Sequence, residues 1–84
     1  MTDSLEEYLY AIYVLSRGKD AVRLTDIANK MEVTKASTNN ALNLLKEQGL
    51  INYEKYKNIT LTISGKTRAK YIERRHELFR IFLK

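Results

Sequence analysis

The sequence predicts a mainly α-helical fold with one small β-hairpin. Apolar residues recur at helical spacing over most of the chain, the spacing changes to alternation only after Gly49, and the 84 residues include no proline that would break a helix. This length suffices for one small domain, so we expect residues 1–84 to fold as a single unit. The absence of cysteine excludes disulfides and thiolate metal sites.

The first helix is predicted from about Leu5 to Ser16. Its apolar stripe consists of Leu5, Tyr8, Leu9, Ile12 and Leu15. Ser4 followed by Glu7 has the pattern of a capping box, which would satisfy the first backbone N–H groups of this helix. Gly18 lies in the turn that is expected to end it.

Two shorter helices are predicted next, with residues 32–34 as a tight connection between them. Thr25 is a candidate N-cap for the second helix and Thr34 for the third. The inward side of the third helix is expected to carry Thr38, Ala41, Leu42 and Leu45. Gly49 should end this helix in the left-handed conformation. Two short helices joined by such a turn form a helix-turn-helix unit.

Alternating residues after Gly49 predict a hairpin with a polar tip at residues 55–58. The apolar residues of its two strands are Leu50, Ile51, Tyr53, Ile59, Leu61 and Ile63. Ser64 is expected to cap a final helix. Its apolar residues Ile72, Phe79 and Phe82 form a candidate dimer contact, or a surface that packs against a further domain in a longer protein. The order helix, helix-turn-helix, hairpin, helix is that of a winged helix-turn-helix domain.

The charge of the chain is +5 and unevenly distributed. The first 16 residues contain three acids and no Lys or Arg, whereas residues 64–84 contain seven cations and two acids. This balance fits a polyanionic partner such as nucleic acid, or a cationic surface kept for solubility. With one histidine, no cysteine and no Gly-rich phosphate loop, the sequence does not predict an enzyme. It has no long apolar run and no signal-type start, so we expect a cytoplasmic protein without a membrane partner.

The start of the third helix carries small and polar side chains suited to base edges in the major groove of DNA. The candidate contacts are Lys35, Ala36, Ser37, Asn39 and Asn40, with Asn43 a further position on the same side. The alternative is an ordinary capped helix with a polar solvent face. Asparagine is a poor helix former, so its repeated use here favours DNA contact.

The hairpin tip is a second candidate for DNA contact. Lys55, Tyr56 and Lys57 are placed to reach the phosphate backbone, although a plain polar turn explains them equally well. We expect Arg68, Arg74 and Arg75 to solvate the last helix.

The chain resembles the amino-terminal DNA-binding domain of the iron- and manganese-dependent repressors, the diphtheria toxin repressor family. The resemblance covers nearly the whole chain, in the order SLEEYLYAIYVL (4–15), VRLTDIA (22–28), VTKAS (33–37), EQGLINYEKY (47–56), LTISG (61–65) and RRHEL (74–78). It implies a homodimeric transcriptional repressor that binds a palindromic operator when Fe(II) or Mn(II) is bound. It also implies that metal bridges the first helix and the helix after the wing.

The same resemblance places metal ligands at Glu7 and His76, whose oxygen and nitrogen donors suit Mn(II) or Fe(II). Tyr10 and Arg80 stand where some members carry further carboxylates. Glu7 is also explained as a capping partner and His76 as a helix-face or core histidine. The family's remaining ligands and dimer interface lie in a second domain that is absent here. We therefore expect metal control in a full-length form and no cofactor for these 84 residues alone.

The sequence thus predicts a DNA-binding transcriptional regulator, and most specifically a repressor. The alternative is a winged helix that contacts another protein and uses its helix-turn-helix only as scaffold. The small, polar start of the third helix favours DNA.

Overall fold

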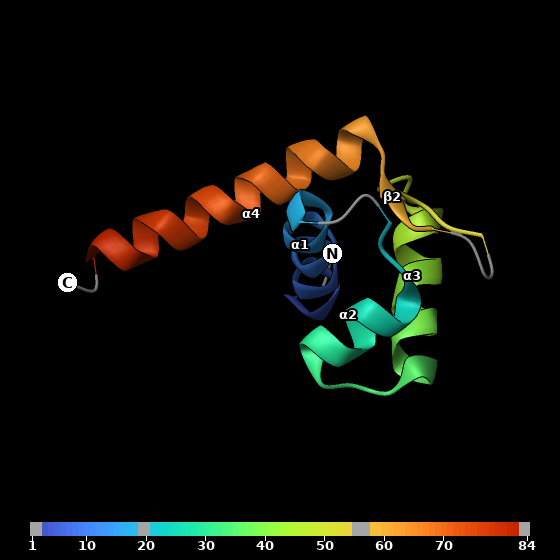
Figure 1. Cartoon of the computed structure of the whole chain (residues 1–84). Helices are drawn as coiled ribbons and strands as arrows, with labels where there is room; N and C mark the ends of the chain where they lie inside the picture. The colour runs from blue at the N-terminus through green and yellow to red at the C-terminus, as the bar shows by residue number, and fades with distance from the viewer. Residues whose placement is uncertain (1–2, 19–20, 55–57, 83–84) are drawn as a thin grey trace.

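The computed structural model describes residues 3–18, 21–54 and 58–82, with side chains at 4–18, 21–54 and 58–77 (Figure 1). Within these residues the elements are α1 (Asp3–Gly18), α2 (Leu24–Met31), α3 (Lys35–Glu47), β1 (Ile51–Asn52), β2 (Thr60–Leu61) and α4 (Ile63–Phe82). This is the predicted winged helix-turn-helix order. None of the described helices is both long and apolar enough to cross a bilayer.

Helix α1 lies at the centre and packs against α2, α3 and α4 (Figure 1). Its inward side is formed by Leu5, Tyr8, Leu9, Ala11 and Ile12, all buried and mostly at the predicted helical spacing. The capping box predicted at its start is wrong. Because α1 already begins at Asp3, Ser4 lies within the first turn and is not the residue that caps it.

The helix-turn-helix unit is held by local hydrogen bonds at each helix start. Helix α2 begins two residues earlier than predicted, since its N-cap is Arg23 and not Thr25. The backbone N–H of Arg23 donates to the Asp26 carboxylate at 2.9 Å. Thr34 caps α3 as predicted, because its hydroxyl accepts the Ser37 N–H at 3.1 Å. Between the two helices, Glu32 adopts the left-handed conformation at φ 56°.

Helix α3 leads into a short antiparallel hairpin. Gly49 takes φ 73°, which confirms its predicted left-handed conformation and turns the chain toward β1. In the hairpin, Ile51 lies opposite Leu61 and Asn52 opposite Thr60. Ile59 also donates its N–H to the carbonyl of Val22 at 2.8 Å, so the segment before α2 pairs with the hairpin.

The start of α4 is fixed by Thr62 and not by Ser64. The Thr62 hydroxyl accepts the N–H of Gly65 at 3.0 Å and donates to the carbonyl of Gly49 at 2.7 Å. One side chain therefore caps α4 and ties it to the end of α3. Ile63, predicted as an apolar residue of the second strand, is the first residue of α4 and is 86% exposed.

The prediction that Ile72 contributes to a dimer contact is wrong. Ile72 is only 2% exposed because it belongs to the core that α4 forms with α1 and the hairpin. Its neighbour Tyr71 is exposed instead. The side chains of Phe79 and Phe82, the other predicted contacts, lie outside the described residues.

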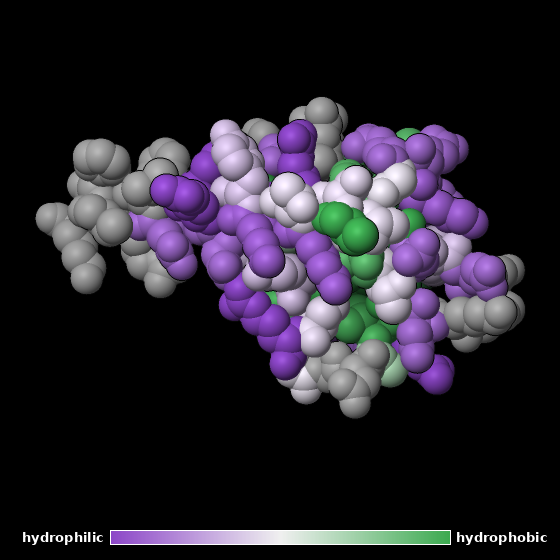
Figure 2. All heavy atoms as spheres, turned by 90° about the horizontal axis from the view of Figure 1, so that it is seen from above, coloured by the Kyte–Doolittle hydropathy of each residue, from purple (hydrophilic) through white to green (hydrophobic). Residues whose placement is uncertain are grey.

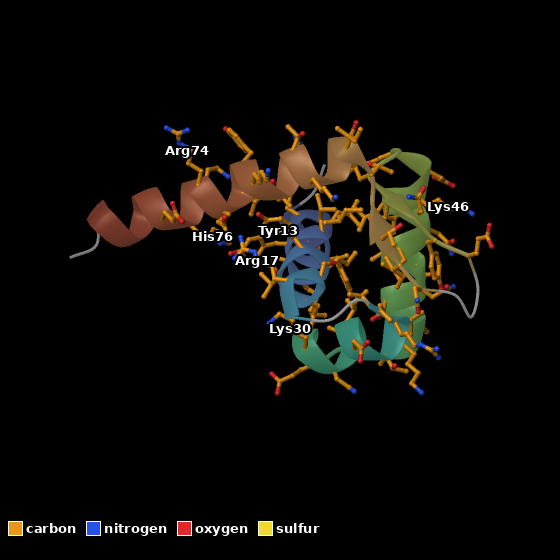
Figure 3. All side chains as sticks on the ribbon, turned by 45° about the horizontal axis from the view of Figure 1, so that its top comes forward. Tyr13, Arg17, Lys30, Lys46, Arg74 and His76 are labelled. Carbon is orange, nitrogen blue, oxygen red and sulfur yellow. The ribbon has the colours of Figure 1, made fainter. Side chains whose placement is uncertain are left out.

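Beyond this core, α4 crosses α1 through charged and aromatic side chains (Figure 3). Arg75 pairs with Glu6 at 2.7 Å, and Arg17 pairs with Glu73. The Arg17 guanidinium also lies 4.5 Å from the Tyr13 ring centroid. Hydrogen bonds with Tyr13 and, secondly, with Glu73 raise the pKa of Arg17, so it remains a cation at any ordinary pH.

Candidate nucleic-acid interface

The start of α3 exposes most of the residues predicted to contact DNA. Lys35, Ala36, Ser37 and Asn40 are exposed, and Asn39 is half-buried. This orientation follows from the inward side of the helix, where Thr38, Ala41, Leu42 and Leu45 are all buried as predicted. The Thr38 hydroxyl can be buried because it donates to the carbonyl of Thr34 at 2.9 Å.

An open groove of about 690 Å³ runs beside the exposed side of α3. One wall is α3 itself, another is the start of α2, and the third is the chain just after β1. The groove is lined by Arg23, Leu24, Thr25, Lys35, Ala36, Asn39, Asn43, Lys46, Tyr53 and Glu54. Three of these are cations and one, Glu54, is an acid, so the charge of the lining is net positive, and amide, hydroxyl and methyl groups lie among them. This composition suits a polyanion that also presents hydrogen-bonding edges.

Asn39 has a specific partner in this groove. The Tyr53 hydroxyl donates to the amide oxygen of Asn39 at 2.6 Å, across the gap between the hairpin and α3. Tyr53 is buried at 8% exposure, so its ring belongs to the core while its hydroxyl reaches the groove. This bond fixes the amide of Asn39 relative to the helix.

Sequence reasoning missed six of the groove residues, namely Arg23, Leu24, Thr25, Lys46, Tyr53 and Glu54. Arg23, Thr25 and Tyr53 come from segments that only the tertiary fold brings beside α3. Lys46 could have been predicted from helical spacing. It follows Lys35 by eleven residues, or about three helical turns, and therefore lies on the same side of the helix. It extends from the outer side of α3 (Figure 3).

The other residues considered for DNA contact, in the hairpin tip and on α4, differ in their surroundings. Lys55, Tyr56 and Lys57 lie outside the described residues. Arg68 and Arg74 are exposed, and Arg74 points away from α1 (Figure 3). Arg75 does more than solvate α4, because it pairs with Glu6 and lies 5.3 Å from the Tyr71 ring centroid.

The two candidate metal ligands do not complete a metal site by themselves. Glu7 and His76 are both exposed, so the interpretation of His76 as a core histidine is wrong. The His76 ring packs against Tyr10, an aromatic contact between α4 and α1. Among the described side chains, no group of three or more His, Asp or Glu residues is arranged to hold a metal ion. These residues therefore do not fit a complete Mn(II) or Fe(II) site.

Exposed apolar side chains gather at a second place, the first turns of α4. Ile63 and Tyr71 are 86% and 58% exposed, and both line a shallow groove with Gln48, Leu50, Ser64, Thr67 and Arg68. Figure 2 looks onto α4 and shows hydrophobic atoms among hydrophilic ones on this side of the molecule. The surface of this groove is more apolar than that of the groove beside α3, and we call it the apolar groove.

Comparison with known proteins identifies the family. The family model described as "Iron dependent repressor, N-terminal DNA binding domain" matches residues 1–59. The chain belongs to the iron-dependent repressor family. It is similar to the HTH-type transcriptional regulator MntR of Bacillus subtilis and to that of Lysinibacillus sphaericus, with 36% identity to each over 83 residues, or 99% of this chain. It spans 58% of the length of the first relative and 60% of the second.

Solved structures show the same fold in other transcription regulators. MepR, a transcription regulator of the Staphylococcus aureus multidrug efflux pump MepA, matches 99% of this chain with a TM-score of 0.76 and 26% identity. The S. aureus MepR–DNA complex matches with a TM-score of 0.79 and 25% identity. Each match covers 62% of the MepR chain. The winged helix-turn-helix prediction is therefore confirmed, and the relatives are regulators rather than enzymes.

Proposed function

We propose that this chain is the DNA-binding domain of a transcriptional repressor and that α3 enters the major groove of operator DNA. The observation that carries the proposal is the exposed start of α3, where short side chains stand beside a groove that holds three cations. We further propose that residues 1–84 act as one domain and that the regulator works in the cytoplasm.

The side chains of α3, together with Arg23 at the start of α2, divide between base contact and phosphate contact. Ala36, Ser37 and Asn40 are short enough to let the helix backbone approach base edges, and Ser and Asn offer both donors and acceptors. Lys35, Lys46 and Arg23 lie along the groove and suit phosphate oxygens on either side of the contacted bases. We assign Lys55, Tyr56 and Lys57 to the flanking phosphate backbone, one of the two interpretations that the sequence leaves open.

We propose that the longer regulator is a homodimer. A twofold pair would place two copies of α3 about 34 Å apart on successive turns of a palindromic operator. Iron or manganese control, expected from the family, belongs in this proposal to the longer form. Glu7 and His76 would each contribute one donor to a site that other residues complete.

Salt-titrated binding of the 84-residue chain to duplex DNA tests the proposal. Affinity for both random and operator-like duplexes should fall steeply as salt rises, with a log–log slope of roughly −0.9 for each phosphate neutralised. Lys35→Ala should reduce that slope by about one. Lys30→Ala is the matched control, since Lys30 is exposed on α2 and does not line the groove.

Absence of binding at low salt would overturn the proposal. It would favour a protein-contact module, for which the apolar groove with Ile63 and Tyr71 is the observed alternative surface.

A further inference from the structure

We propose that Tyr53 sets the base preference of Asn39 by locking its side-chain amide in one orientation, so that Asn39 acts toward DNA as a hydrogen-bond donor only. The inference deepens the proposed DNA-binding function and rests on it. Tyr53 is then a positioning residue, because it acts through Asn39 and not on the DNA itself.

The length of the bond supports this orientation of the amide. The phenol oxygen of Tyr53 lies 2.6 Å from Asn39 Oδ1. Such a short distance is usual for an O–H group donating to a carbonyl oxygen, whereas an amide N–H donating to a hydroxyl is typically nearer 2.9 Å. The amide oxygen therefore faces Tyr53, and the amide nitrogen is left for the groove that both residues line.

The surroundings of Tyr53 make the lock rigid. Tyr53 is 8% exposed and packs in the core cluster, so its hydroxyl is held at a fixed place. Asn39 is half-buried on α3, whose backbone is fixed from within by the buried Leu42 and Leu45. Turning the amide over would replace this bond with an N–H donating to the phenol oxygen, and because 2.6 Å is short for such a bond, Tyr53 and Asn39 would have to move apart.

A locked amide has a chemical consequence for base recognition. A free asparagine reads adenine with both its atoms, its oxygen accepting from N6 and its nitrogen donating to N7. Because the amide oxygen faces Tyr53, Asn39 presents its N–H donors and not its oxygen to the DNA. The base it suits best is one with acceptors alone in the major groove, and guanine presents two, N7 and O6.

The probe is a duplex library with a randomised central segment, selected separately with wild-type chain and variants. Wild type should select guanine at the position that Asn39 contacts, and 7-deazaguanine there should weaken binding by about 2- to 10-fold, the effect of one hydrogen bond. Tyr53→Phe keeps the ring and removes the hydroxyl. It should shift the selected base from guanine toward adenine and lower the sensitivity to 7-deazaguanine.

Two further variants separate positioning from general structure. Tyr71→Phe is the matched control, because it removes a hydroxyl from an exposed tyrosine on α4 outside the α3 groove, and it should select the wild-type sequence. Asn39→Ala should lose the guanine preference, and adding Tyr53→Phe to it should change nothing more. Asn39→Ala keeps the proposal testable if Tyr53→Phe does not fold.

The outcomes distinguish the two proposals. Sequence-selective, salt-sensitive binding with the same base preference in wild type and Tyr53→Phe would overturn the amide lock and leave the DNA-binding function intact. A Tyr53→Phe effect that persists in the Asn39→Ala background would also overturn the lock. Absence of DNA binding by the wild-type chain would overturn both.

Discussion

The imidazole ring of His76 on α4 meets the ring of Tyr10 on α1 edge-on, with 4.9 Å between the ring centroids. This aromatic contact lies in the same helix crossing as the ion pair between Arg75 and Glu6. At this crossing of α1 and α4, the predicted metal ligand His76 therefore faces Tyr10. Tyr10 has no carboxylate with which to bind a metal ion.

Replacing Tyr10 with a carboxylate should strengthen metal binding at this crossing. Tyr10→Glu puts a negative charge near His76, one turn after Glu7. We expect Mn(II) affinity to rise roughly 10- to 30-fold, since two unit charges about 4 Å apart are worth about 1 kcal/mol even in water and the ion is divalent. Titration of free Mn(II) by electron paramagnetic resonance measures the change.

Tyr13→Glu is the matched control, because it adds the same charge to α1 at a residue that contacts Arg17. The gain at Tyr10→Glu should vanish when His76→Ala is added. An equal gain in Tyr13→Glu, or a gain that survives His76→Ala, would show only nonspecific attraction to negative charge.

Removing the cap of α3 should weaken the fold. Thr34→Ala loses the hydroxyl that accepts the Ser37 N–H, so we expect the free energy of unfolding to fall by about 1 kcal/mol. Urea denaturation followed by circular dichroism measures it. Thr25→Ala makes the same chemical change inside the first turn of α2, where Arg23 is the N-cap, and should change stability by less than about 0.5 kcal/mol. Equal losses in both variants would refute the role of Thr34.

The caps illustrate how far the sequence predicts this fold. Thr34, Gly49 and the inward side of α3 follow from local spacing, and the structure confirms them. The predictions of Thr25 and Ser64 as caps are wrong, because the residue two positions earlier caps the helix in each case. At α4 the cap is Thr62, whose hydroxyl is also bonded to Gly49 thirteen residues earlier. Local spacing does not encode such a distant partner.

Which side chains of α4 are buried also depends on contacts between segments that are distant in the sequence. Tyr71 and Ile72 are adjacent apolar residues. Ile72 lies on the side of α4 that packs against α1 and is buried, whereas Tyr71 lies outside this contact and is exposed. The candidate site likewise has a part that the sequence predicts and a part that it does not. The exposed residues of α3 could be predicted from helical spacing, whereas the bond between Tyr53 and Asn39 joins a strand end to a helix and needs the tertiary fold.

A methyl group at Gly65 should damage the junction of α4 with the hairpin. The Cβ of alanine there would overlap the carbonyl oxygen of Leu50, which accepts the N–H of Thr62. We expect Gly65→Ala to lower the free energy of unfolding by about 2–3 kcal/mol, because backbone must move to make room. Gly18→Ala, whose Cβ would meet open space at the end of α1, should leave stability within about 1 kcal/mol of wild type. Thermal unfolding measures both variants. Equal midpoint temperatures for Gly65→Ala and Gly18→Ala would refute the predicted overlap at Gly65.

Asn40 should read one base pair. It is exposed on α3, so Asn40→Ala should weaken binding to a selected operator by about 1–3 kcal/mol and relax the preference at one position. Asn29→Ala, an exposed asparagine on α2, is the control and should bind as wild type does. A uniform loss across all duplexes would make Asn40 a backbone contact instead.

The central claim is that the exposed side of α3 touches DNA, and nuclear magnetic resonance of the isotope-labelled chain tests it most directly. On titration with a selected duplex at low salt, the largest amide shift changes should fall at residues 35–40 and at Asn43 and Lys46, with α1 little affected. Changes confined to the apolar groove around Ile63 and Tyr71, or no changes at all, would contradict the claim.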